Sequence, residues 1–321
     1  MNYDIIGDVH GHADALQALL ADLGYRNTGG AWRHPDRQAL FVGDFIDRGP
    51  KQLESVDLVR RMVDVGSAKA VMGNHEFNAI AWFLPDPECP GEYLRKHHSA
   101  KYGDKNRRQH QAFLSAVEGT QLHEELVSWF LSLPVFLDLP ELRLVHACWH
   151  PAALDFLLPH LTGDHRMMLE SMILATQEPV EESDKDTPDL TVFKAVEAVL
   201  KGIEVQLPSP QTFRDKDGHE RDRVRVRWWE NQATDYRRAA MLPAQERVAF
   251  PEDLVPAHAL IGHDGGKPVF VGHYWLTGTP TRLSDKVACL DYSIAKGGKL
   301  VAYRWDGEPT LDESKLHWVR S

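Results

Sequence analysis

The sequence is poor in cysteine, and this shortage excludes two kinds of protein. Its 321 residues include three cysteines, Cys89, Cys148 and Cys289, which are widely spaced and form no C-x-x-C pair. We therefore expect neither a disulfide framework nor a structural zinc site built on thiolates. A reducing compartment fits this cysteine usage best, so we expect a cytoplasmic protein.

Long apolar runs and positive charge are also scarce. No stretch approaches the roughly 20 apolar residues that span a bilayer, and the first residues, MNYDIIGD, show no basic region before an apolar one. We therefore expect no secretory signal and no membrane association. The 36 Lys and Arg are outnumbered by 47 Asp and Glu, giving a net charge of −11. This charge opposes bulk nucleic-acid binding.

The first 80 residues alternate between predicted strands and predicted helices. Short apolar runs at 3–6, 39–42 and 69–72 predict buried strands, and apolar residues at helical spacing predict helices over 13–24 and 50–66. This β-α-β-α-β order indicates a sheet with parallel strands and covering helices.

Later in the chain, further apolar runs predict more strands, which lie at 142–146, 268–272, 286–291 and 299–305. The late strands are closely spaced and joined by Gly-rich turns, so we expect them to form an antiparallel second sheet.

The region between these strands has a different composition. Residues 151–250 are polar and of helical character, with an acidic stretch, EPVEESDKDTPD, and a basic one, RDRVRVRWWENQATDYRR. We interpret 151–250 as an insertion or cap on a core formed by 1–150 and 251–321. Residues 85–125 are a candidate for a second, smaller cover.

Polar motifs follow the predicted strands. They read GDVHGH (7–12), GDFIDRG (43–49) and GNHE (73–76), with LVHACWHP and FVGHYW later. Ligands bind at the carboxyl ends of strands in open α/β sheets, so we expect these motifs to meet at one edge. Their candidate metal ligands are Asp8, His10, Asp44, Asn74, His146 and His273. Such oxygen and nitrogen donors suit two divalent transition-metal ions.

Two divalent ions in such a site could support phosphoryl transfer. The carboxylate of Asp44 could bridge the two ions, and a water between them would become hydroxide near neutral pH and attack phosphorus in line. Arg48 could hold two phosphate oxygens with its planar guanidinium. His75 could protonate the leaving oxygen, with Asp47 orienting the imidazole.

Each motif has a simpler explanation when it is taken alone, such as a capped turn at the start of a helix. Their joint presence, in order and about 30 residues apart at first, favours the metal site. His12 fits a helix start better than a ligand. His263, in LIGHDGG, is a rival to His273, which we prefer because PVFVG predicts a better strand before it.

These motif strings resemble those of the calcineurin-like metallophosphoesterases. Within that superfamily they are most similar to the branch of Ser/Thr phosphoprotein phosphatases and bacterial diadenosine tetraphosphatases. The resemblance implies an α/β fold of the α+β four-layer type, with a central β-sandwich of mixed sheets flanked by helices and, here, a largely helical insertion. One departure is Tyr274-Trp275 after His273, where the family more often has threonine.

The resemblance also implies roles for individual residues. Asp8, His10 and Asp44 would bind one ion, and Asp44, Asn74, His146 and His273 the other; His75 with Asp47 would be the leaving-group acid, and Arg48 the phosphate clamp. A second phosphate-binding arginine would come from the insertion, where the candidates are Arg221, Arg223, Arg225, Arg227, Arg237 and Arg238.

The expected function is therefore metal-dependent phosphate-ester hydrolysis, with manganese as the expected metal and iron or zinc as alternatives. We first expect a phosphomonoesterase that resembles Ser/Thr protein phosphatases and acts on small phosphorylated molecules or phosphoproteins. The alternative substrate is a dinucleoside polyphosphate, whose bases would stack on aromatic side chains lining the substrate site. The candidates for these side chains are Trp149, Trp228, Trp229, Tyr274 and Trp275. An inactive metal-binding scaffold is the outside alternative, which the complete set of motif residues disfavours.

Overall fold

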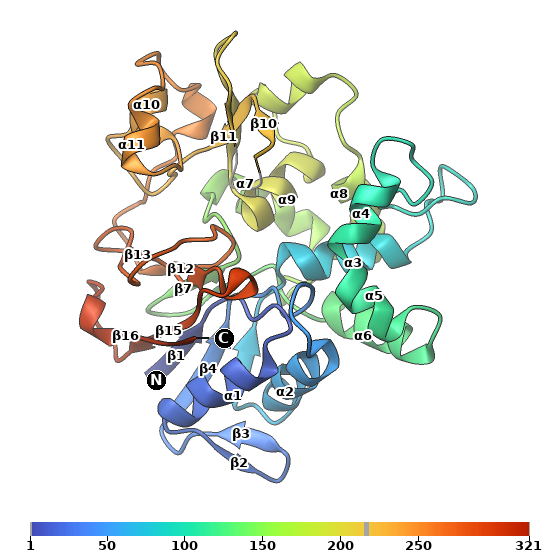
Figure 1. Ribbon diagram of the computed structural model, residues 1–321, viewed down its shortest axis with the longest axis vertical. Helices are drawn as coiled ribbons and strands as arrows, with labels where there is room; N and C mark the ends of the chain where they lie inside the picture. Colours follow the sequence, from blue (N-terminus) through green and yellow to red (C-terminus); the bar gives the residue numbers. More distant parts are fainter. Residues whose placement is uncertain (1, 215–217, 321) are drawn as a thin grey trace.

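The computed structural model describes residues 2–214 and 218–320, and it contains two main β-sheets (Figure 1). The larger has the strand order β14-β15-β1-β4-β5, with β16 also paired to β15. Its strands are β1 (Asn2–Ile6), β4 (Arg37–Phe41), β5 (Ala68–Ala70), β14 (Asp291–Tyr292), β15 (Lys299–Trp305) and β16 (Leu316–Arg320). The second sheet has the order β13-β12-β7-β6, with strands β6 (Phe136–Asp138), β7 (Arg143–Val145), β12 (Val269–Val271) and β13 (Val287–Cys289).

Alternation along the strands places the two sheets face to face. Ile5 of β1 and Leu144 of β7 belong to one buried cluster, which also holds Phe270 and Tyr303. Neighbouring residues in the same strands, such as Ile6, belong instead to a second and larger cluster. Because successive side chains in a strand point to opposite faces, the smaller cluster is the interior of a β-sandwich.

Helices cover the outer side of each sheet. α1 (Ala13–Asp22) packs on β15 and β16, and α2 (Gln52–Asp64) packs on β5. On the other side, α7 (Pro151–Leu157) packs against α9 (Val192–Lys201), and the backbone oxygen of Val199 in α9 accepts a hydrogen bond from Ala147 N, at 3.0 Å. The four-layer α/β fold that we expected is confirmed.

The remaining elements lie at the margins of this sandwich. α3 (Asn74–Phe83), α4 (Gly103–Gln109), α5 (Gln111–Val117) and α6 (Gln121–Leu131) form a group on one side, and the hairpin β2 (Arg26–Thr28) and β3 (Ala31–Arg33) lies beyond α2 (Figure 1). Residues 151–250 also contain α8 (Leu169–Thr176), β8 (Glu204–Gln206) paired with β11 (Arg223–Arg225), β9 (Phe213–Arg214) paired with β10 (Glu220–Arg221), α10 (Tyr236–Ala239) and α11 (Ala244–Arg247). The domain boundaries stay a prediction.

One expectation about the sheets is wrong. The late strands do not form one antiparallel sheet: β12 pairs in parallel with β13 and with β7, whereas β15 pairs antiparallel with β1 in the other sheet. The connection between β12 and β13 is long enough to cross over, so close spacing in the sequence did not imply a hairpin. In the described part of the chain, none of the helices is both long and apolar enough to cross a membrane.

Candidate metal centre

The polar motifs meet where β1, β4, β5, β7 and β12 end. The backbone oxygen of Asp44 accepts hydrogen bonds from Val9 N and His10 N, at 3.0 and 2.9 Å, which fixes the first loop on the second. In the second sheet, just past the ends of β12 and β7, Gly272 N donates to His146 O at 2.8 Å. All six predicted ligands are at most 9% exposed: Asp8, His10, Asp44, Asn74, His146 and His273.

These loops have an unusual backbone conformation. Positive φ angles, which favour glycine, occur at His10, Asp44, Asp47, Arg48, His273 and Trp275. Each such residue costs on the order of 1–3 kcal/mol, and such strain persists where the surrounding structure imposes it, often at functional sites. Glycine is required at two close approaches: a Cβ on Gly73 would lie 2.2 Å from Asp44 Oδ1, and one on Gly272 would lie 1.9 Å from Asp8 Oδ1.

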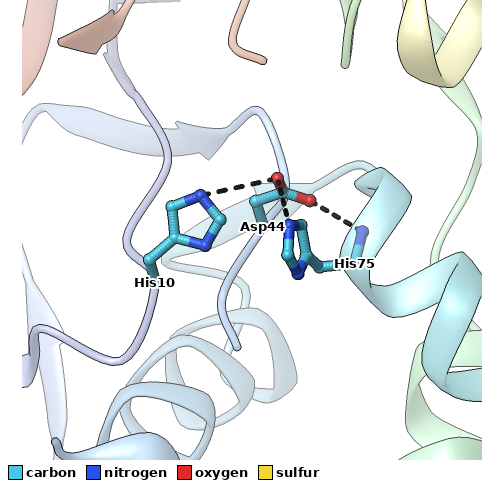
Figure 2. A group of neighbouring side chains, drawn as sticks. All are labelled: His10, Asp44 and His75. Carbon is cyan, nitrogen blue, oxygen red and sulfur yellow. Dashed lines mark hydrogen bonds and ion pairs between the residues drawn. The ribbon is translucent and has the colours of Figure 1, made fainter. Parts of the chain in front are cut away.

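Asp44 is at the middle of the cluster (Figure 2). Its Oδ1 accepts a hydrogen bond from His75 N at 2.9 Å. Its Oδ2 lies 3.7 Å from His10 Nε2 and 3.9 Å from His75 Nε2, with both rings turned toward it. His146 Nε2 approaches the same oxygen to 3.4 Å. One carboxylate therefore faces three imidazole nitrogens.

Backbone carbonyls fix the orientation of two of these rings. His10 Nδ1 donates to Ile46 O at 3.0 Å, and His146 Nδ1 donates to Val42 O at 2.8 Å. A proton on Nδ1 leaves the Nε2 lone pair available in the neutral ring, as a metal ligand requires.

Asn74 joins the remaining predicted ligands to this group. Its side-chain oxygen lies 2.7 Å from His273 Nδ1 and 3.1 Å from His146 Nε2. His273 N donates to Asp8 Oδ2 at 2.9 Å. The structure thus brings all six predicted ligands together, although their roles as ligands stay predictions. The rival, His263, lies elsewhere and bonds to Asn231 and to Lys267 O.

Burial and neighbouring charges shift the pKa values of the clustered side chains in different directions. Burial, helped by Asp291, raises the pKa of Asp8 well above its ordinary value. Burial also acts to raise the pKa of Asp44, but His146 and His75 hold it well below its usual range. Burial lowers the pKa of His10 to about 4, whereas the effect of Asp44 outweighs burial at His146 and raises its pKa to about 10.

Several buried polar atoms in the cluster have no hydrogen-bond partner among the residues that the structure describes. They are Asp8 Oδ1, His10 Nε2 and His273 Nε2, each on a predicted ligand. Unsatisfied buried groups of this kind are rare and need an explanation such as an ion. In the described residues, three groups have ligand atoms close enough to hold an ion: Asp8 with Asp44 and His146, His10 with Asp44 and His75, and Asp47 with His75 and His110. The donor set of carboxylate and imidazole therefore fits divalent transition metals.

The predicted catalytic residues border this cluster. His75 Nδ1 lies 2.6 Å from Asp47 Oδ2, as an oriented acid requires. Burial acts to lower the pKa of His75, but Asp44 and Asp47 outweigh it and raise that pKa. Arg48 is exposed on the same loop, and its guanidinium carbon lies 5.5 Å from the ring centre of Trp275.

Comparison with known proteins supports the reading of the motifs. Residues 1–150 match the family model described as calcineurin-like phosphoesterase. The resemblance is confirmed over these residues. They carry five of the six predicted ligands and all three predicted catalytic residues; His273 lies beyond the match.

Among curated relatives, a Halalkalibacterium halodurans protein named bis(5'-nucleosyl)-tetraphosphatase PrpE (asymmetrical) is 51% identical over 76 residues, or 23% of this chain and 31% of the relative. A Bacillus cereus protein of the same name is 29% identical over 149 residues, covering 45% of this chain and 56% of the relative. The chain thus matches only a third to about half of these relatives' length.

A structural comparison adds no argument about function. The crystal structure of a cold-active protein-tyrosine phosphatase from a psychrophilic Shewanella has 16% identity, covers 97% of this chain and 80% of that one, and gives a TM-score of 0.46. A similarity at this level does not transfer activity or substrate.

Three buried residues that contact the cluster or its loops were not predicted from the sequence. Glu76 accepts hydrogen bonds from the backbone of Asp44 and Phe45, both at 2.8 Å, and thereby holds the second loop. Asp291 accepts one from Trp275 N at 2.7 Å. His110 contacts Asp47. Glu76 stands inside the quoted GNHE motif and Asp291 at the end of the predicted strand 286–291, so both could have been singled out; His110 lies in no recognised motif.

The structure distinguishes among the candidate arginines of the insertion. Arg223 pairs with Asp186, Arg227 with Glu230, Arg237 with Glu252 and Arg238 with Asp235. Arg225 differs from these four because its charge acts on the cluster. After burial, that charge is the largest influence that lowers the pKa of His273. Arg225 also pairs with Glu204, Nε to Oε1, at 3.2 Å.

The five aromatic side chains predicted as candidates for base stacking differ in their exposure to solvent. Trp149, Trp228, Trp229 and Tyr274 are at most 8% exposed and serve packing. Trp275 is partly exposed, and its ring centre lies 5.7 Å from that of His10.

Proposed function

We propose that the chain is a metal-dependent phosphohydrolase with two divalent ions, for which we expect manganese, with iron or zinc as alternatives. The observation that carries the proposal is the set of imidazole Nε2 atoms around Asp44 Oδ2, from His10, His75 and His146, at 3.4–3.9 Å. Burying carboxylates in such a cluster costs free energy unless cations neutralise their charge.

When bound, the two ions would supply an activated water and neutralise charge on the phosphoryl group. The six predicted ligands would hold them. Arg48 would bind phosphate oxygens from one side of the cluster, and Arg225 from the insertion would approach from the side of His273. His75 would donate the proton on Nε2 to the leaving oxygen, because its Nδ1 faces Asp47.

A second candidate substrate class is a dinucleoside polyphosphate. Two observations favour it: the partly exposed ring of Trp275, with Arg48 and Lys296 at 5.5 and 5.3 Å from its centre, and the similarity to relatives named bis(5'-nucleosyl)-tetraphosphatase. An aromatic ring beside cations suits a substrate that combines a base with several phosphates.

The test is a panel of substrates assayed with added manganese: p-nitrophenyl phosphate, phosphopeptides, mononucleotides and diadenosine tetraphosphate. Hydrolysis of at least one, abolished by a chelator and restored by the metal, supports the proposal. His75→Asn should retain the metals and slow turnover most for poor leaving groups. No hydrolysis of any substrate at any metal concentration would instead favour the inactive scaffold.

A further inference from the structure

The carboxylate of Asp47 contacts two imidazoles, although only one was expected. Its Oδ2 lies 2.6 Å from His75 Nδ1 and also 2.6 Å from His110 Nδ1. The three side chains are buried, and their ligand-type atoms form one compact group. His110 lies at the junction of α4 and α5, within the predicted smaller cover over 85–125.

The short distances fix where protons lie. Two acceptors 2.6 Å apart would repel each other, so each Nδ1 that faces the carboxylate carries a proton. His75 therefore has its Nε2 left for the reacting side, and that atom is the one directed toward Asp44. His110 has no such outlet: in the described residues its Nε2 is buried without a hydrogen-bond partner, and its Nδ1, although 2.6 Å from Asp47 Oδ2, is not aligned for a regular hydrogen bond.

The surroundings of His110 indicate a neutral ring. Arg95, which is half-buried in the same cover segment, donates to Asn78 and Gln109. Burial lowers the pKa of His110, and the charge of Arg95 acts in the same direction against the opposing effect of Asp47. A neutral imidazole can hold its Nδ1 against Asp47 Oδ2, at 2.6 Å, without cancelling the negative charge of the carboxylate, which remains available to His75.

Asp47 itself needs this support. Its backbone is in the left-handed region, at φ 69°, and its amide donates to Gln52 Oε1 at 2.6 Å. These contacts fix the backbone, while the two histidines fix the carboxylate. If packing alone were needed at position 110, an apolar side chain would avoid the unsatisfied Nε2.

We propose that His110 is a positioning residue for the leaving-group acid: it holds the Asp47 carboxylate in the orientation that directs His75 Nε2 toward the leaving oxygen. The inference rests on the proposed function. The oxygen of the attacking water bonds to phosphorus as the P–O bond to the leaving group breaks; the electron pair of the broken bond goes to the leaving oxygen, which takes the proton from His75 Nε2 and leaves His75 neutral. His110 neither gains nor loses a proton in this step.

The experiment compares two substrates that differ in their need for protonation, p-nitrophenyl phosphate and phenyl phosphate, with manganese present. The variants are His110→Ala, His110→Asn and His110→Gln. The asparagine amide can replace the donor at Nδ1, whereas the glutamine amide reaches the position of Nε2. The matched control is His123→Ala, because His123 is also buried in this region but packs on Phe83 and Phe113.

We expect His110→Ala to lower kcat for phenyl phosphate about tenfold and for p-nitrophenyl phosphate less than about threefold, since acid catalysis matters most for poor leaving groups. His110→Asn should recover most of the loss, and His110→Gln should not. The control should affect both substrates equally. Metal content should not change in any variant.

Three results would overturn the inference: equal losses on both substrates, equal activity of the asparagine and glutamine variants, or loss of metal with loss of His110. The asparagine and glutamine pair decides the matter even if the alanine variant does not fold. A wild-type protein that hydrolyses neither these substrates nor any of the wider panel would overturn the proposed function itself, and the inference with it.

Discussion

The ring of Trp275 lies 5.5 Å from the guanidinium carbon of Arg48, in the range of a cation–π contact. Asp291 holds the Trp275 backbone at φ 52° by accepting its amide hydrogen at 2.7 Å. A tryptophan in this conformation is strained, so the fold maintains the ring beside the predicted phosphate clamp at a cost. We infer that the ring restrains Arg48 and forms one wall of the substrate site.

Replacing this ring should weaken substrate binding. Trp275→Leu should raise KM for hydrolysed phosphate esters by about 3- to 30-fold, the equivalent of one partly desolvated cation–π contact. The increase should be larger for diadenosine tetraphosphate than for p-nitrophenyl phosphate if a base stacks there. Steady-state kinetics on both substrates measure the effect.

Trp318→Leu is the matched control for this variant. Trp318 is 41% exposed on β16 and has its own cation–π contact, with Lys299 at 5.5 Å. It should leave KM unchanged. Equal effects of the two substitutions would show that the Trp275 ring has no special relation to the substrate.

Arg225 gives a second prediction for substrate binding. Arg225→Gln should raise KM for phosphate esters about 10- to 100-fold, which corresponds to the loss of a hydrogen bond to a charged group. Arg227→Gln is the control, because Arg227 pairs with Glu230 at 2.7 Å and not with the cluster. If both variants bind inorganic phosphate as the wild type does in a competition assay, Arg225 is not a phosphate ligand.

A third prediction concerns stability away from the site. Asp4 is fully buried, and Arg37 Nε donates to both of its carboxylate oxygens at 3.0 Å. Removing one partner of a buried pair leaves the other charge unpaired, at a cost of about 3–5 kcal/mol, and Arg304 at 3.2 Å compensates in part.

Arg37→Gln should therefore lower the free energy of unfolding by about 2–3 kcal/mol in a urea titration. Arg61→Gln serves as the comparison, since Arg61 and Asp57 form an exposed pair on α2, which solvent screens and which should contribute little to stability. Similar losses in the two variants would contradict a special role for the buried pair.

Local sequence patterns predicted most of the strands and the candidate ligands. Gly-Asp and Gly-Asn pairs after apolar runs indicated where each strand ends, and strand ends meet because parallel strands share an edge. His273 could be preferred over His263 because of the strand before it. In the structure, His273 and not His263 lies beside Asn74.

Features that depend on pairing between distant segments could not be predicted in this way. The position of β15 next to β1 is set by sheet register, not by local pattern. The same holds for His110, which reaches Asp47 from 63 positions along the chain because α4 and α5 fold over the loop. Arg225 is distinguished from Arg223, Arg227, Arg237 and Arg238 only by its position in the folded chain.

We infer that Asp44 joins two metal sites. The direct measurement is the number of manganese ions bound per chain after equilibrium dialysis of metal-free protein, for the wild type, Asp44→Asn and a control, Asp86→Asn, whose carboxylate pairs with Lys96 outside the cluster. We predict two ions for the wild type and the control, and fewer than one for Asp44→Asn. No bound ion in the wild type, or two ions retained by Asp44→Asn, would contradict the account.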